Sequence, residues 1–192
     1  MATQEQLIDI DAVTELMRQP EFADKRFYLI DGEIIEMSPV QRVHSRLASM
    51  IDFFLRGYVM SKDLGEVHVE HGFRPPGDRN TMLAPDVAFI SHARLSGQPA
   101  DGFITVMPDL AVEIASPNDS LAQLRRKARI YLDNGSRLVW IILPSQRGVD
   151  VCRSASGARL DIEFVGSDGA LSGEEALPGF ELELSRLFPA PK

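Results

Sequence analysis

The sequence has a single cysteine and no long apolar run, and both absences limit what the protein can be. Cys152 has no second cysteine to pair with, which excludes an internal disulfide and fits a reducing compartment. No stretch approaches the ~18 consecutive apolar residues that a membrane-spanning helix needs. Residues 1–5 lack the basic start and apolar core of a secretory signal. We therefore expect a cytoplasmic protein with no membrane partner.

Positive charge is also scarce, because 20 Lys and Arg residues stand against 28 Asp and Glu residues, a formal net charge of −8. Residues 161–183 contain no Lys or Arg and hold a run of acidic residues: Asp161, Glu163, Asp168, Glu174, Glu175, Glu181 and Glu183. Residues 119–129 reverse the sign and hold these charged residues: Asp119, Arg125, Arg126, Lys127 and Arg129. Such a basic patch can hold phosphates with an affinity that falls with salt, and a solvated helix face is the other interpretation.

Length and hydrophobic patterning predict an α/β (α+β) fold with a central mixed sheet flanked by helices. A chain of 192 residues can bury a sizeable core, and we expect one domain over residues 1–192. The turn Asp31-Gly32 predicts a hairpin, and the apolar run 138–143 predicts a strand buried on both faces. Helices are expected at 11–18, from Ser38-Pro39 onward, at 120–133 and at 184–188. Strands are expected within 26–37 and at 66–74, 86–90, 109–115, 138–143, 148–153 and 159–165.

Two carboxylates accompany apolar runs of strand length in the middle of the chain. Asp86 enters such a run after Pro85, where it can act as a structural cap or point into a cleft. Glu113 stands inside the run 109–115, and a buried carboxylate is costly unless it is paired or binds a metal. Two carboxylates with waters and a backbone carbonyl satisfy Mg²⁺. Asp86 and Glu113 therefore predict a site for Mg²⁺, with Mn²⁺ as a substitute.

The helix predicted after these strands carries a candidate catalytic cation, because a lysine can polarise a phosphate or its attacking water. The apolar stripe of this helix consists of Leu121, Leu124, Ala128, Tyr131 and Leu132. Lys127 lies on one edge of the stripe and Arg125 on the other, whereas Arg126 points to solvent. Helical phase leaves Lys127 and Arg125 as candidates, and a lysine stem that only covers apolar surface stays an alternative.

These residues belong to an ordered series of motifs. The series is Tyr28-Leu29-Ile30-Asp31-Gly32-Glu33-Ile34-Ile35-Glu36-Met37-Ser38-Pro39, His44, Pro85-Asp86-Val87, Val112-Glu113-Ile114-Ala115-Ser116-Pro117, Lys127, Tyr131, Gly135, Trp140 and Leu177-Pro178-Gly179-Phe180. The ordered set resembles the Uma-two family of endonucleases, which belongs to the PD-(D/E)XK restriction-endonuclease-like superfamily. The resemblance spans about residues 12–188 and implies a restriction-endonuclease-like core with a magnesium-dependent site.

The resemblance also implies roles for three central residues. Asp86 and Glu113 match the acidic metal ligands of the superfamily. The lysine expected two positions after Glu113 is replaced by Ala115, and Lys127 matches a catalytic lysine that has moved to the following helix.

Two further residues match auxiliary positions of the family. Glu33 resembles an additional acidic residue near the site, and a surface charge on the hairpin is the other interpretation. His44 matches a histidine that contacts phosphate or water at the metal, and a structural, hydrogen-bonded histidine is the other interpretation.

The leading functional hypothesis is a metal-dependent endonuclease that hydrolyses phosphodiester bonds of DNA. The alternative is a non-catalytic nucleic-acid-binding or assembly module that retains the nuclease-like fold, which the acidic composition favours. Cleavage of both strands of a duplex would favour a homodimer.

Overall fold

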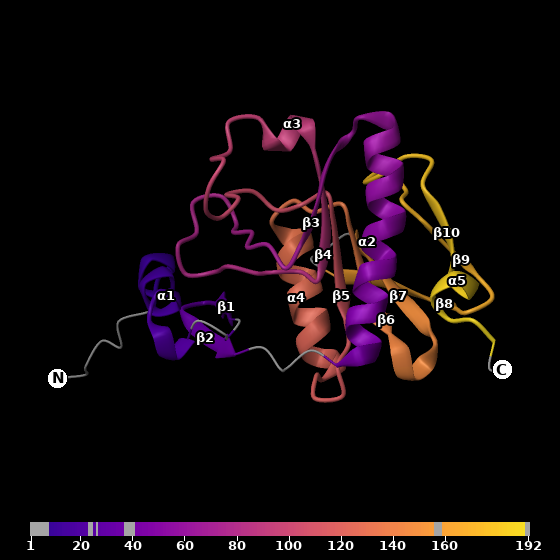
Figure 1. Cartoon of the computed structure of the whole chain (residues 1–192), viewed down its shortest axis with the longest axis horizontal. Coiled ribbons are helices and arrows are strands. Elements are labelled where there is room, and N and C mark those ends of the chain that lie inside the picture. The colour runs from indigo at the N-terminus through magenta and orange to yellow at the C-terminus, as the bar shows by residue number, and fades with distance from the viewer. Residues whose placement is uncertain (1–7, 23–24, 26, 37–40, 156–158, 191–192) are drawn as a thin grey trace.

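The computed structural model of the chain has a six-stranded β-sheet at its centre, with helices on both faces (Figure 1). It describes residues 8–22, 25, 27–36, 41–155 and 159–190. The predicted mixed α/β fold is confirmed. Within these ranges, no helix has both the length and the apolar character needed to cross a membrane.

The strand order explains why the sheet is mixed. From one edge to the other, the strands are β3 (Gly65–Val69), β4 (Val87–Ser91), β5 (Leu110–Ile114), β6 (Leu138–Leu143), β7 (Gly148–Ala155) and β8 (Arg159–Gly166). Only β5 and β6 run parallel, and the other neighbouring pairs are antiparallel. A parallel pair needs a crossover connection, and helix α4 (Leu121–Asp133) supplies it here.

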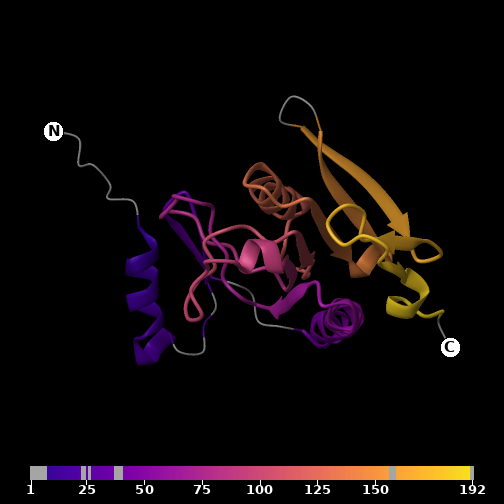
Figure 2. The same ribbon diagram turned by 90° about the horizontal axis from the view of Figure 1, so that it is seen from above.

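The two faces of the sheet are covered by different helices (Figure 2). Helix α2 (Arg42–Lys62) lies on one face, and α4 lies on the other. Side chains of a strand alternate between faces. In β5, Leu110, Val112 and Ile114 therefore join the core beneath α2, whereas Ala111 joins the core beneath α4. The same alternation sends Glu113 to the α4 face.

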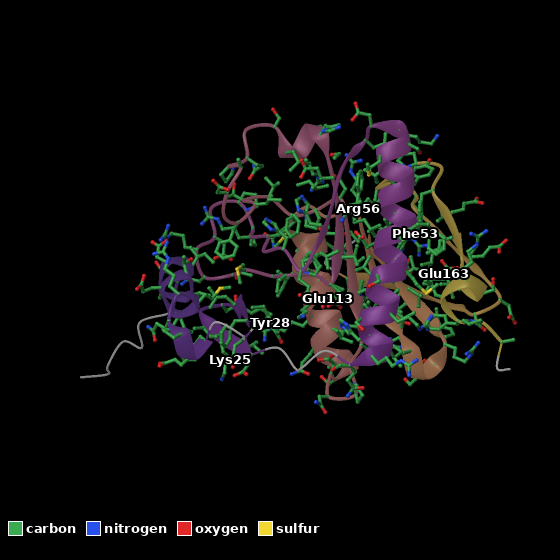
Figure 3. All side chains as sticks on the ribbon, in the orientation of Figure 1. Lys25, Tyr28, Phe53, Arg56, Glu113 and Glu163 are labelled. Carbon is green, nitrogen blue, oxygen red and sulfur yellow. The ribbon has the colours of Figure 1, made fainter. Side chains whose placement is uncertain are left out.

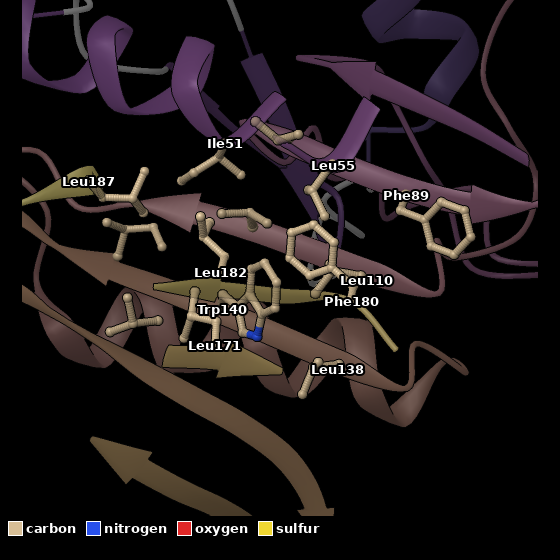
Figure 4. Packing of buried hydrophobic residues seen from close by; sticks show 14 of the residues in the cluster. Ile51, Leu55, Phe89, Leu110, Leu138, Trp140, Leu171, Phe180, Leu182 and Leu187 are labelled. Atoms are coloured by element: carbon tan, nitrogen blue, oxygen red, sulfur yellow. The ribbon is translucent and has the colours of Figure 1, made fainter. Parts of the chain in front are cut away.

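The core beneath α2 also receives the C-terminal elements (Figure 4). These are β9 (Ala170–Ser172), β10 (Glu181–Glu183) and α5 (Leu184–Leu187). Trp140 on β6 is completely buried in this core, with its ring 6.1 Å from that of Phe180. The predicted helical turn at 184–188 corresponds to α5.

The core beneath α4 also receives the N-terminal hairpin of β1 (Phe27–Ile30) and β2 (Glu33–Glu36). Asp31 and Gly32 form its two-residue turn with φ angles of 53° and 79°, as the Asp-Gly sequence predicts. Helix α1 (Ile10–Met17) packs behind the hairpin through a small apolar cluster. The remaining short helices are α3 (His92–Leu95), η1 (Pro20–Phe22) and η2 (Pro144–Gln146).

The observed bounds of β3, α2 and α4 can be compared with the predicted ones. The strand predicted at 66–74 is wrong in its second half, because Glu70 adopts a φ of 53° and ends β3 at Val69. The long helix predicted from Ser38-Pro39 begins, in the described part of the chain, at Arg42, and Ser38-Pro39 lies outside the described residues. The helix predicted at 120–133 corresponds to α4 within one residue.

Trp140 provides a test of this packing. We expect Trp140→Ala to lower the free energy of unfolding by about 3–5 kcal/mol, because it leaves a large cavity between β6 and Phe180. Trp140→Phe should cost less than about 1.5 kcal/mol, since it keeps a ring and removes an indole N–H that has no hydrogen-bond partner among the described residues.

Urea unfolding followed by circular dichroism measures both changes. Phe53→Ala on the outer side of α2, where the side chain is 70% exposed, is the control and should change stability by less than about 0.5 kcal/mol. Equal losses for Trp140→Ala and Phe53→Ala would contradict the assigned core.

Candidate active site

Asp86 and Glu113 are neighbours at the end of the β4–β5 ladder. The ladder pairs Val87 with Val112, so the next positions outward are Asp86 and Glu113. Oδ2 of Asp86 accepts a hydrogen bond from the backbone N–H of Ile114 at 2.6 Å, which fixes the carboxylate beside Glu113. Both residues are 3% exposed. The structure therefore brings together the two carboxylates that the sequence proposes as metal ligands.

Glu113, which is labelled in Figure 3, is held by two side chains of α4. Lys127 donates from Nζ to Oε2 at 2.9 Å, and Tyr131 donates from its hydroxyl to Oε1 at 2.8 Å. Lys127 and Tyr131 are four residues apart and so lie on the same helix face. Tyr131 is predicted as core from its phase, and the structure shows that it is both core and hydrogen-bond donor.

Asp86 is contacted from the opposite side by α2. Nε2 of His44 lies 3.1 Å from Oδ1 of Asp86, and the His44 side chain is 13% exposed. His44 stands in the first turn of α2, so this contact joins the start of that helix to the entry of β4. This contact with Asp86 is compatible with both predicted interpretations of His44, the structural histidine and the histidine that contacts phosphate or water.

Tyr28 is a site neighbour whose contact the sequence did not predict. Its ring centroid lies 4.2 Å from Nζ of Lys127, within the range of a cation–π interaction. The hairpin that carries Tyr28 is also joined to α4 by an ion pair of 2.9 Å between Asp31 and Arg126. The sequence position of Tyr28 in the first strand of the hairpin does not indicate this contact. The contact depends on how the hairpin packs against α4.

The other basic residues of α4 are held away from Glu113. Arg125 pairs with Asp150 on β7 at 2.9 Å, and Arg126 pairs with the exposed Asp31. Of the two candidates that helical phase leaves open, the structure therefore brings Lys127, and not Arg125, to the carboxylates. The predicted basic patch at 119–129 is largely neutralised by these acidic partners.

Burial and neighbouring charges together set the pKa values of Glu113, Lys127 and Tyr131. Burial raises the pKa of Glu113, the Lys127 ammonium opposes this shift, and the Asp86 carboxylate adds to it. Burial alone lowers the pKa of Lys127, but the charge of Glu113 outweighs it and the net direction is upward. Burial, reinforced by Glu113, raises the pKa of Tyr131 well above its ordinary value, so its hydroxyl remains a donor.

Comparisons with known proteins identify the group to which this architecture belongs. The model of the Uma2 family, described as "Putative restriction endonuclease", matches residues 13–185. The chain belongs to this family. Its membership supports a nuclease-like function. No curated protein matches the chain.

A solved structure confirms the fold of this Uma2 member. It is the crystal structure of "a putative nuclease belonging to DUF820" from Anabaena variabilis ATCC 29413. The similarity has a TM-score of 0.78 at 21% sequence identity, and it covers 94% of this chain and 97% of that chain. The restriction-endonuclease-like architecture predicted from the motifs is thereby supported over nearly the whole chain.

Glu33 has no bond to the other predicted site residues among the residues that the structure describes. It is exposed at the start of β2, opposite Ile30 in the hairpin. Among the described residues, no hydrogen bond or ion pair links it to Asp86, Glu113 or Lys127. No such contact supports the auxiliary role of Glu33, and its exposed position fits the other interpretation, a surface charge on the hairpin.

The start of α4 is fixed by a side-chain cap. Ser120 is the N-cap, and it forms a reciprocal capping box with Gln123. Asp119 instead accepts a hydrogen bond from the N–H of Ser116 at 2.7 Å. The cap fixes the first turn of α4 and hence the phase at which Lys127 faces Glu113.

The donor set of this Uma2 site suits a hard cation. Asp86 and Glu113 offer four oxygens, each with one hydrogen-bonding or ionic partner and a second lone pair available. Within the described ranges, no group of three His, Cys, Asp or Glu side chains is arranged to hold a metal. Two carboxylates fit a hard divalent cation such as Mg²⁺ only if water and backbone oxygen would supply its remaining ligands.

The Lys127–Glu113 pair can be tested through stability. We expect Lys127→Met to lower the free energy of unfolding by about 3–5 kcal/mol, because it leaves a buried carboxylate without its cation. The double variant Lys127→Met/Glu113→Gln should recover most of this loss, since neither charge is then buried. Denaturant unfolding without divalent cations measures both.

Arg126→Met is the matched control on the next residue of α4. Its ion pair with Asp31 is solvent-exposed, so its loss should cost less than about 1 kcal/mol. A double variant as unstable as Lys127→Met would show that the buried charge of Glu113 is not the cause.

The raised pKa of Glu113 predicts the pH dependence of stability. The folded chain holds the Glu113 proton to a higher pH than the unfolded chain, whose carboxyl has the ordinary pKa of 4.5. The free energy of unfolding should therefore fall as the pH rises from 4.5 through the raised pKa of Glu113. The pKa of Lys127 is also raised, so Lys127 stays charged in this range. Unfolding of wild type and Glu113→Gln from pH 4 to 8 should show this extra fall only in wild type. Parallel curves would refute it.

Proposed function

We propose that the protein is a metal-dependent endonuclease that hydrolyses phosphodiester bonds of DNA. The observation that carries the proposal is the buried cluster in which the ammonium of Lys127 contacts Glu113 beside Asp86. This cluster combines two hard oxygen ligands with a fixed cation in a chain of the Uma2 family. A purely structural ion pair needs only one carboxylate for one cation. The second buried carboxylate, Asp86, therefore favours a metal site over a structural ion pair.

Asp86 and Glu113 would hold Mg²⁺, or Mn²⁺ in its place. When bound, the ion would supply Lewis-acid stabilisation of the negative charge that develops on the phosphate. The N–H of Ile114 orients Asp86, and the hydroxyl of Tyr131 orients Glu113, so both carboxylates are preorganised by groups that carry no charge.

Lys127 would stabilise the phosphate in the transition state or orient the attacking water. Its ammonium is held between Oε2 of Glu113 and the ring of Tyr28, and its side chain is 9% exposed. A cation fixed in a site of low polarity stabilises developing charge more strongly than a solvated one. One or more N–H donors of the ammonium remain for the substrate after the bond to Glu113.

His44 would act on the opposite side of Asp86. Its Nε2 contact with Oδ1 holds the carboxylate in place, and its partial exposure allows the ring to contact phosphate or water at the site. We assign no role to Glu33, because no hydrogen bond or ion pair within the described part of the chain connects it to this cluster.

A second function is favoured by a specific observation. Each oxygen of Asp86 and Glu113 already has a partner within the chain, and the arginines of α4 at 125 and 126 are paired with carboxylates. Such a closed site suits a non-catalytic nucleic-acid-binding or assembly module that retains the nuclease-like fold. The net charge of −8 points the same way.

Cleavage of supercoiled plasmid DNA tests the endonuclease. We expect nicked and linear products with Mg²⁺ or Mn²⁺ and none with EDTA. Asp86→Ala and Lys127→Met should each lower the rate by at least about 100-fold, because each removes charge stabilisation of the transition state. Arg126→Met, which removes a cation that faces away from the site, should cleave within a few-fold of wild type.

Calorimetric titration with Mg²⁺ separates the two functions. An endonuclease binds Mg²⁺ through Asp86 and Glu113, so Glu113→Gln should weaken binding and abolish cleavage together. A folded chain that binds neither metal, and that cleaves neither DNA nor RNA with either metal, would favour the non-catalytic module.

A further inference from the structure

Strand β3 forms one edge of the central sheet, and its outer side is unpaired within the described residues. It contacts α2 beside it, as Figure 1 shows, and pairs with β4 on its inner side. An unpaired edge presents backbone N–H and C=O groups that can template another strand. The opposite edge, β8, is protected by charge, because Arg159, Asp161 and Glu163 follow one another at alternate exposed positions.

The hydrogen-bond pattern identifies which groups of β3 face outward. Bonds flanking the ladder run from the N–H of His92 to the C=O of Leu64 and from the N–H of Glu70 to the C=O of Asp86. Hydrogen-bonded and non-hydrogen-bonded pairs alternate in an antiparallel ladder. Residues 66 and 68 therefore bond to β4, and the backbone groups of Gly65, Val67 and Val69 point away from the sheet.

A groove runs along this edge between β3 and α2. It has a volume of about 350 Å³ and is lined by Arg56, Val59 and Met60 of α2 and by residues 65–68 of β3. Met60 is 73% exposed and Val69 is 46% exposed, so apolar surface borders the unpaired backbone. Arg56 and the neighbouring Phe53 are labelled on α2 in Figure 3.

We propose that a second copy of this chain docks on this edge, with the two β3 strands antiparallel and the two-fold axis at Val67. In this register Val67 faces Val67 of the second copy, and Gly65 faces Val69 of the second copy at both ends. All the outward backbone groups of residues 65, 67 and 69 then pair with one another. The sheet becomes continuous across the two copies.

Complementarity of the polar side chains of β3 supports a second copy over an unrelated strand. The same register places Glu66 opposite His68 of the second copy, and His68 opposite Glu66 of the second copy. Within one chain these two side chains already lie on the same face, with Oε2 and Nε2 2.9 Å apart. A carboxylate acceptor and an imidazole ring thus face each other twice in the antiparallel register, so the order of polar side chains along β3 is complementary to itself, and complementary pairs across strands stabilise pairing.

Side-chain size supports the same register. Gly65 has no side chain, so none projects from this position against the exposed Val69 of the second copy. Val69 has the same parity as Val67, whose side chain belongs to the core beneath α2, and so it would enter the groove beside Met60. The interface would thus bury apolar surface that each chain alone exposes.

Sedimentation equilibrium of the full chain over about 1–200 μM, a range suited to a small interface, tests the proposal. We expect a monomer–dimer equilibrium in wild type. His68→Glu should weaken dimerisation about tenfold or more, because two like-charge contacts replace two complementary ones. The double variant Glu66→Lys/His68→Glu restores opposite charges and should recover the affinity. Glu181→Lys, the same charge reversal at an exposed position of β10, is the control and should dimerise like wild type.

Amide hydrogen exchange by NMR gives a second, residue-specific readout. The amides of Val67 and Val69 should exchange faster on dilution to monomer, whereas those of Glu66 and His68 stay protected by β4. Circular dichroism establishes that each variant is folded.

A wild type that remains monomeric overturns the proposal. So does a dimer that His68→Glu leaves unchanged, or one that the double variant fails to restore. The readouts need no nuclease activity, so the interface stands or falls independently of the proposed function.

Discussion

The buried contact between Lys127 and Glu113 is the interaction on which the site depends. A carboxylate on the α4 face of a central strand loses its hydration, and only a cation and hydrogen-bond donors in the same place offset that loss. Lys127 and Tyr131 occupy both of its oxygens, and Tyr28 covers the lysine from the hairpin. From the crossover helix, Lys127 thus contacts both the middle strand and the N-terminal hairpin.

The position of this contact follows from elementary geometry. Strand alternation sends Glu113 to the face opposite Val112 and Ile114, which is the face that α4 covers as the crossover between the parallel strands β5 and β6. The capping box at Ser120 sets the helix phase, so Lys127 and Tyr131 face the strand and Arg126 faces outward. His44 reaches Asp86 because α2 begins at the same end of the sheet. Each group is placed by a different local rule.

Much of this could be predicted from the sequence because the signals are local. Asp31-Gly32 specifies its own turn, and Glu113 stands out inside an apolar run. Other features require contacts between distant segments. Helical phase could not separate Lys127 from Arg125, because only the position of Asp150 on β7 decides it. The burial of the Asp109 carboxylate could not be predicted from the sequence, because its partner Arg94 lies on a different element.

The unpaired edge of the sheet and the carboxylate cluster are structurally connected. Beyond Val69, the N–H of Glu70 lies 3.4 Å from the backbone C=O of Asp86, so β3 ends beside the residue that opens the site. A strand bound along β3 would restrict the backbone that carries Asp86, because neighbouring strands of a sheet share one hydrogen-bonded ladder. The antiparallel two-fold arrangement would also place the two carboxylate clusters at opposite ends of one continuous sheet. The charged residues of β8 disfavour pairing with another strand, whereas β3 lacks this protection. Only pairing along β3 would therefore reach the backbone that carries Asp86.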